Sequence, residues 1–106
     1  MLQIDKLIMP TSKEVEVLVI ESVRLLAEDF DLVALQQPSA ESALYGNDGV
    51  LDSMALVNLL ADVEDAVSEQ FGAAIALADE KAMSARHSPF LTIKTLAQAV
   101  LERIEA

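Results

Sequence analysis

Leu51-Asp52-Ser53-Met54 opens the stretch that decides the fold, and Ala55-Leu56-Val57-Asn58-Leu59-Leu60-Ala61-Asp62-Val63-Glu64-Asp65-Ala66-Val67-Ser68-Glu69-Gln70-Phe71 continues it. Apolar residues recur in it at the helical period and predict one buried stripe, made of Leu56, Leu60, Val63, Val67 and Phe71 and widened by Val57 and Leu59. Aspartate is a favoured N-cap, and glycine is favoured just beyond a helix end. We therefore expect a helix from Ser53 to Phe71, capped by Asp52 and stopped by Gly72.

A further helix is expected on each side of this stretch. Before it, Thr11-Ser12-Lys13-Glu14 fits a capping box, and these apolar positions follow at helical spacing: Val15, Leu18, Val19, Val23, Leu26 and Phe30. An alternating pattern at residues 14–17 competes as a strand, but the cap and the length of the helical pattern favour a helix. After it, Thr92 caps a last helix with apolar residues Ile93, Leu96, Ala97, Val100, Leu101 and Ile104.

These patterns predict an all-α fold, a small bundle of three main helices plus a short helix at residues 79–85 before the last one. We expect residues 1–10 to be an N-terminal lead-in and residues 11–106 to form a single domain, because 106 residues suffice for one modest core. The connection at residues 31–50 is long for a compact helical domain. Its start, Leu32-Val33-Ala34-Leu35, is expected to touch the core, and its end carries the turn sequence Asn47-Asp48-Gly49.

Charge and composition restrict the possible partners. Seven Lys and Arg against eighteen Asp and Glu give a net charge of -11. Such a chain repels phosphate backbones and anionic membrane surfaces, which argues against nucleic acid and favours a basic patch on another protein. The absence of cysteine excludes disulfides, a thiol nucleophile and a thiolate metal site. No apolar run is long enough to span a bilayer and the N-terminal residues do not resemble a signal peptide, so we expect a cytoplasmic protein, and a monomer.

Ser53 is the candidate functional residue, because it lies at the first exposed turn of an acidic amphipathic helix. The sequence argues against an enzyme: His87 is the only histidine that could serve as a base, and the G-x-S-x-G elbow is absent. No metal is expected, since nothing near His87 has ligand spacing and residues 47–49 do not fit a calcium loop. Taken alone, Asp52-Ser53 is also what an ordinary helix start looks like.

The turn-rich approach Tyr45-Gly46-Asn47-Asp48-Gly49-Val50, the motif Leu51-Asp52-Ser53-Met54 and the long acidic helix ending in Phe71-Gly72 together resemble the acyl carrier protein family. The resemblance covers residues 15–104 in helix order and is sharpest over residues 50–71. It implies an acyl-carrier-like bundle that catalyses nothing itself. It also implies that Ser53 is joined covalently to 4'-phosphopantetheine from coenzyme A, whose thiol holds an acyl or aminoacyl group as a thioester. Asp52, and more weakly Asp48, would lie near the metal ion of the transferase that installs the arm.

The resemblance further implies which proteins this chain meets in fatty-acid or secondary-metabolite biosynthesis. They are a phosphopantetheinyl transferase, an acyl- or aminoacyl-activating ligase, and downstream transferases or synthases, all docking through basic patches. Asn58, Asp62, Asp65 and Glu69 stand at spacings of four, three and four, so they line one face that such partners would contact. Met54 is counted with these partner-binding residues, although methionine at such a position more often fills gaps in a core. One or more of Val57, Leu59 and Ala61 could also be exposed near Ser53 and contact partners, although packing in the core is the commoner role of such residues.

Two features depart from the common fatty-acid carriers. The stretch from Ser53 to Phe71 is about one helical turn longer, and Arg86-His87-Ser88-Pro89-Phe90 stands as an insert before the last helix. Both look like a branch of small stand-alone carriers that serve dedicated ligases or aminoacyl-activating enzymes. The alternative interpretation is an acidic helical adaptor, a protein-interaction domain without the prosthetic group.

Overall fold

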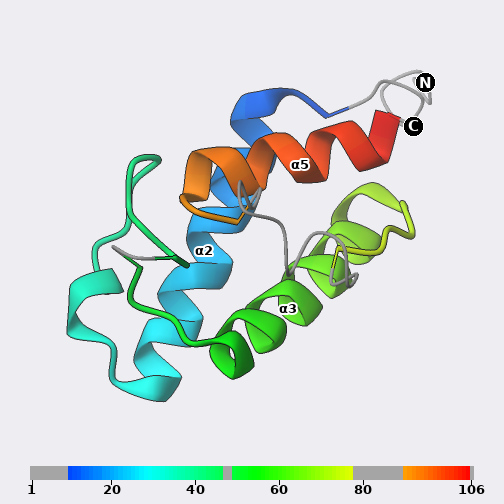
Figure 1. Ribbon diagram of the computed structural model, residues 1–106. Helices are drawn as coiled ribbons and strands as arrows, with labels where there is room; N and C mark the ends of the chain where they lie inside the picture. Colours follow the sequence, from blue (N-terminus) through cyan, green and yellow to red (C-terminus); the bar gives the residue numbers. More distant parts are fainter. Residues whose placement is uncertain (1–9, 47–48, 78–89, 106) are drawn as a thin grey trace.

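The computed structural model describes residues 10–46, 49–77 and 90–105. These residues form the helices α2 (Ser12–Phe30), α3 (Ser53–Phe71) and α5 (Ile93–Glu105), and one 3-10 turn, η1 (Val33–Leu35). Figure 1 shows α2 running through the centre of the molecule, with α5 crossing it near its start and α3 lying towards its other end. α2 packs against both of these helices. The predicted all-α bundle is therefore confirmed for the described part of the chain, and the short helix predicted at residues 79–85 lies outside it.

The predicted caps set the ends of the helices. In the capping box of α2 the Thr11 hydroxyl accepts a hydrogen bond from the Glu14 N–H (3.1 Å), and the Glu14 carboxylate accepts one from the Thr11 N–H (2.8 Å). This reciprocal cap begins a helix where residues 14–17 alternate like a strand. The Thr92 hydroxyl accepts from the Thr95 N–H (3.2 Å) at the start of α5. Gly72 ends α3 with a φ of 66°, a conformation that glycine adopts without strain.

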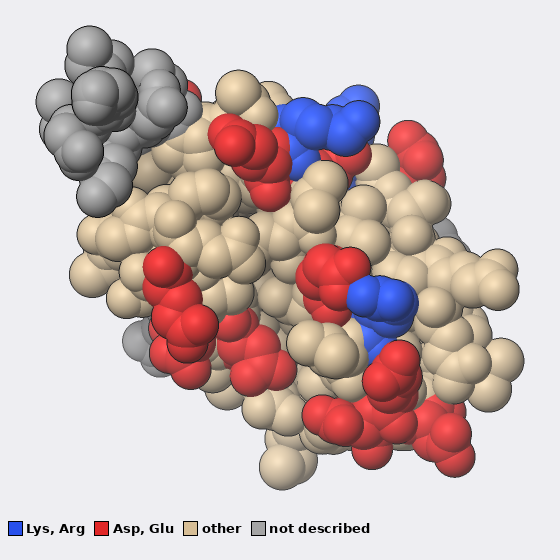
Figure 2. Space-filling view, turned by 180° about the vertical axis from the view of Figure 1, so that it is seen from behind, with Lys and Arg blue, Asp and Glu red and all other residues tan. Residues whose placement is uncertain are grey.

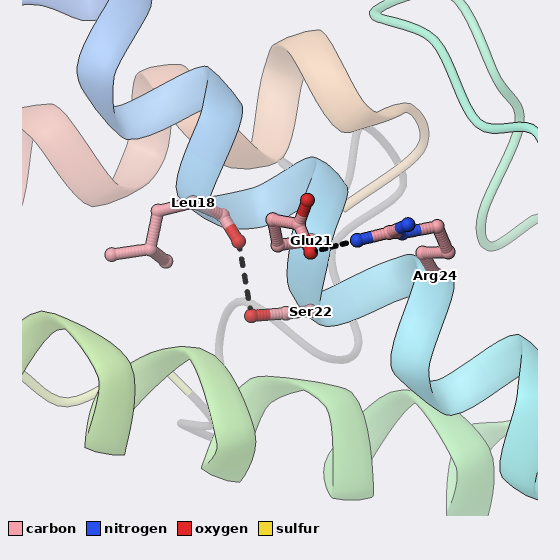
Figure 3. A network of polar contacts seen from close by, with 4 residues as sticks. All are labelled: Leu18, Glu21, Ser22 and Arg24. Atoms are coloured by element: carbon pink, nitrogen blue, oxygen red, sulfur yellow. Dashed lines mark hydrogen bonds and ion pairs between the residues drawn. The ribbon is translucent and has the colours of Figure 1, made fainter.

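The core lies where α2 meets the other two helices. Its largest fully buried side chains include Leu26 from α2, Leu56, Leu59 and Leu60 from α3, and Ile93 and Leu96 from α5. Among the described residues Ser22 is the only buried polar side chain, and its hydroxyl donates to the Leu18 carbonyl oxygen (3.1 Å; Figure 3). Glu21 and Arg24 form an ion pair on exposed turns of the same helix (Figure 3). α2 can therefore bury one face completely, because its one buried hydroxyl is satisfied within the helix.

Outside α3, two apolar residues expected in the core, Phe30 and Val33, are exposed. Phe30, assigned to the buried face of α2, is 48% exposed because it is the last residue of the helix. The chain reverses directly after it: Asp31 is left-handed (φ 60°), and the Leu32 N–H donates to the Ala27 carbonyl (2.8 Å), so no later turn shields Phe30. In the stretch 32–35, Leu35 is fully buried as expected, but Val33 is 78% exposed. A short 3-10 turn can direct only one of its sides to the core.

The segment after α3 is fixed from two sides. Leu77 is completely buried, and its N–H donates to the Glu64 carboxylate on α3 (2.7 Å). The Arg103 guanidinium on α5 donates to the Ala76 carbonyl oxygen (2.8 Å). One side chain from each helix thus holds the backbone of residues 76–77, Glu64 from the middle of α3 and Arg103 from the last turn of α5.

Candidate functional site

Ser53 is the first residue of α3 and is exposed. Asp52 before it is extended (φ -82°, ψ 178°), its side chain accepts from the Ala55 N–H (2.8 Å), and its carbonyl accepts from the Leu56 N–H (2.9 Å). The N–H groups of Ser53 and Met54 have no acceptor within the helix, as in the first turn of any α-helix. The Ser53 hydroxyl therefore stands at the positive end of the helix dipole, where negative charge is stabilised.

A buried anchor lies just before this cap. Leu51 is 5% exposed, and its N–H donates to the carbonyl of Leu44 (2.8 Å), which is itself completely buried. Ser53 is thus two residues away from a side chain fixed in the core. Asp48, the weaker candidate for the same neighbourhood, lies outside the described residues.

The apolar residues beside Ser53 differ from the expected core pattern. Met54 is 82% exposed, so the interpretation that it fills the core is wrong. Val57, predicted to widen the buried stripe, is 45% exposed, and Ala61 is exposed as well, whereas Leu59 is completely buried. Residues 54, 57 and 61 are three and four positions apart, so they share the helix face turned away from the core. We call Met54, Val57 and Ala61 the apolar strip; it begins directly next to Ser53.

The four polar residues predicted to share a face, Asn58, Asp62, Asp65 and Glu69, are all exposed on α3. Burial raises the pKa of Asp62 above its ordinary value, and the nearby carboxylates of Asp65 and Asp29 raise it further. Asp29 comes from the last turn of α2, which contains no basic residue. The negative charge along α3 is therefore continued by a second helix, a neighbour that the spacing within α3 could not reveal.

Acidic side chains recur elsewhere on the molecule. On the face seen in Figure 2 they gather in separate groups, with smaller areas of Lys and Arg between them. Within the described ranges, no three His, Cys, Asp or Glu side chains are arranged to hold a metal ion. His87, the histidine weighed as a base, lies outside these ranges. In the same part of the chain, no helix is both long enough and apolar enough to cross a membrane.

No protein-family model matches the chain. No curated protein and no solved structure matches it at a significant level.

Proposed function

We propose that this protein is an acyl or aminoacyl carrier, with Ser53 as the attachment position of a 4'-phosphopantetheine arm. One observation carries the proposal: an exposed serine hydroxyl stands at the positive end of a 19-residue helix, directly after a capping aspartate and directly before a methionine that is 82% exposed. A structural helix start would explain the cap alone. It does not account for the apolar strip of Met54, Val57 and Ala61, which starts beside the serine and continues along the exposed face of α3.

The residues around Ser53 fit the arm. A phosphodiester on the hydroxyl would lie next to the N–H groups of Ser53 and Met54, which are free of intrahelical acceptors and favour an anion. The arm would supply a thiol that carries cargo as a thioester, a group that a chain without cysteine cannot provide itself. The Asp52 carboxylate uses Oδ1 for the Ala55 N–H. Its second oxygen can face the metal ion of a transferase, because an ionised carboxylate accepts at both oxygens.

The surface next to Ser53 fits transient visits to partner enzymes. The apolar strip offers contact area, and Asp62, Asp65 and Glu69 lie exposed on the same helix. With a net charge of -11 the chain attracts basic surfaces from a distance, which raises the association rate more than the affinity. A carrier must also leave each partner again, and fast, weak docking suits that requirement. We further propose that the carrier works as a monomer in the cytoplasm.

Intact mass tests the proposal. The full chain is incubated with coenzyme A, Mg²⁺ and several broad-specificity phosphopantetheinyl transferases, beside the variants Ser53→Ala and Ser68→Ala. Ser68 is an exposed serine on the same helix and serves as the matched control. The expected result is a gain of one phosphopantetheine in the wild type and in Ser68→Ala, and none in Ser53→Ala. No gain in a folded wild-type sample would reject the carrier function and leave the acidic adaptor as the better interpretation.

A further inference from the structure

The start of α3 and the start of α5 are joined through a single buried residue. The Leu44 carbonyl oxygen accepts from the N–H of Leu51, just before the cap of α3 (2.8 Å). The Leu44 N–H donates to the carbonyl of Leu91, just before the cap of α5 (2.7 Å). The Leu44 side chain is completely buried, so neither bond is open to water on that side. A displacement of Leu91 would therefore move Leu44, and Leu44 would in turn move Leu51, which directly precedes Asp52 and Ser53.

The loop that contains Leu44, residues 40–46, also caps α5. The N–H groups of Ile93 and Lys94, the first two of the helix, donate to the carbonyl oxygens of Ser42 (3.2 Å) and Ala40 (2.8 Å). The Thr95 N–H donates to the Thr92 hydroxyl, and the Thr92 N–H donates in return to the Thr95 hydroxyl (3.0 Å). The four N–H groups at the start of α5 that lack an intrahelical partner, those of residues 92–95, are thereby satisfied. The loop and the first turn of α5 depend on each other, and the Ala43–Thr92 bridge lies between them.

Gly49, two residues before Leu51, lies close to the backbone of residues 44–45. Gly49 donates its N–H to the Gly46 carbonyl (3.1 Å). A Cβ at Gly49 would lie 2.5 Å from the Cα of Tyr45 and 2.6 Å from the Leu44 carbonyl oxygen, both of them backbone atoms. Backbone cannot move aside as the end of a side chain can. Gly49 therefore lies so close to residues 44–45 that only glycine fits at this position.

We propose that residues 40–46 and 49–51 form a positioning clamp, in which the N-cap of α5 at Thr92 fixes the place of Ser53 through Leu91, Leu44 and Leu51. Thr92 is then a positioning residue for Ser53, although it belongs to a different helix and follows it by 39 positions in the sequence. The consequence for the modification of Ser53 rests on the proposed carrier function. The mechanical coupling itself does not.

Two matched threonine caps make the coupling testable. Thr92→Ala removes the hydroxyl that caps α5, and Thr11→Ala removes the equivalent hydroxyl at the start of α2, which has no bond to the clamp. Amide hydrogen exchange of the full chain is measured by NMR at Leu44 and Leu51. We expect both amides to exchange about fivefold faster in Thr92→Ala than in Thr11→Ala, the factor that loss of one threonine cap represents. Thr92→Ser keeps the hydroxyl and should restore the wild-type rates.

Equal exchange rates at Leu51 in the two alanine variants would overturn the clamp. A second pair of variants, at the glycines before and after α3, tests whether a change in the loop affects α5. Gly49→Ala places a methyl group against backbone, whereas Gly72→Ala strains the far end of α3 with no atom within 4 Å of the new Cβ. Faster exchange at Ile93 and Lys94 is expected in Gly49→Ala only, and its absence there would also contradict the clamp.

The initial rate of phosphopantetheine transfer to Ser53 supplies the functional comparison. We expect it to fall about fivefold in Thr92→Ala relative to Thr11→Ala, in parallel with exchange at Leu51, and to recover in Thr92→Ser. If the wild type is not modified at all, the proposed carrier function is wrong, while the exchange measurements still decide whether the clamp exists.

Discussion

Asp52 has two proposed roles, and two substitutions separate them. As N-cap it accepts the Ala55 N–H at 2.8 Å. Asp52→Ala leaves that N–H without its acceptor, which costs about 1 kcal/mol and lowers Tm by about 4 to 8 °C in a domain of this size. Asp52→Asn keeps an oxygen at the same position, and asparagine is as good an N-cap as aspartate. It loses only the attraction between the charge and the helix dipole, about 0.3 to 1 kcal/mol, on a chain that already carries excess negative charge.

The second role, beside the metal ion of a transferase, predicts a different order of the variants. Both substitutions remove the carboxylate, so both should slow the modification of Ser53, by roughly tenfold or more on the scale of lost contacts around a metal site. The assay is the initial rate of mass gain with coenzyme A and Mg²⁺, together with thermal unfolding followed by circular dichroism. Stability should therefore decrease in the order wild type, Asp52→Asn, Asp52→Ala. The modification rate, in contrast, should be lowered to a similar extent in both variants.

One result would refute this reasoning directly. If Asp52→Asn were modified at the wild-type rate while Asp52→Ala were slow, Asp52 would act on Ser53 only by capping the helix. An Asp52→Ala variant that melts with the wild type would show instead that the cap bond contributes nothing to stability.

Two further predictions concern the surface of α3. Because the pKa of Asp62 is raised in the folded state, the folded protein holds this proton more tightly than the unfolded chain, so stability falls as pH rises through the window just above the ordinary aspartate range. Asp62→Asn should raise Tm at pH 7 and low salt by about 2 to 4 °C, and the gain should vanish near pH 3. Glu69→Gln, which removes one charge from the same helix, is measured over the same pH range as a control. A gain in Tm from Asp62→Asn that stays constant across this range would contradict the prediction. Replacing Met54 and Val57 together by serine should change the unfolding free energy by less than about 1 kcal/mol while raising the KM of the transferase. Leu59→Ala on the buried face should cost about 2 to 5 kcal/mol in urea unfolding, and a similar loss in the serine variant would mean that the strip is structural.

The helix boundaries could be predicted from the sequence because they depend on local chemistry. Thr11, Asp52 and Thr92 each accept an N–H three residues further on, and Gly72 supplies the left-handed end of α3. These interactions involve residues within one turn of each other, so their spacing in the sequence is their spacing in space. The bundle of three main helices follows from the same signals together with the 3.6-residue period.

Contacts between distant residues could not be predicted in this way. The pairing of Leu44 with Leu91 joins positions 47 residues apart, and no motif marks either of them. Asp29 affects Asp62 only because α2 and α3 pack together. The periodic pattern also assigns a valine to the core wherever its position fits the helical period. The pattern depends only on the polarity of the residues and does not show whether another helix covers that face.

The same difference between pattern and burial occurs at the candidate site. The pattern overestimated burial at Val57 beside Ser53 and at Phe30 at the end of α2, and the common role of methionine would have placed Met54 in the core. An apolar residue that fits the pattern and remains exposed contributes little to packing within this chain. At Phe30 the helix end accounts for the exposure. At Met54 and Val57 the helix continues for several more turns, as it does at Val17 and Leu25 of α2, which are exposed to a similar extent as Val57. What distinguishes Met54 and Val57 is their place beside Ser53, and for that reason we propose the apolar strip, together with the charge along α3, as a docking surface.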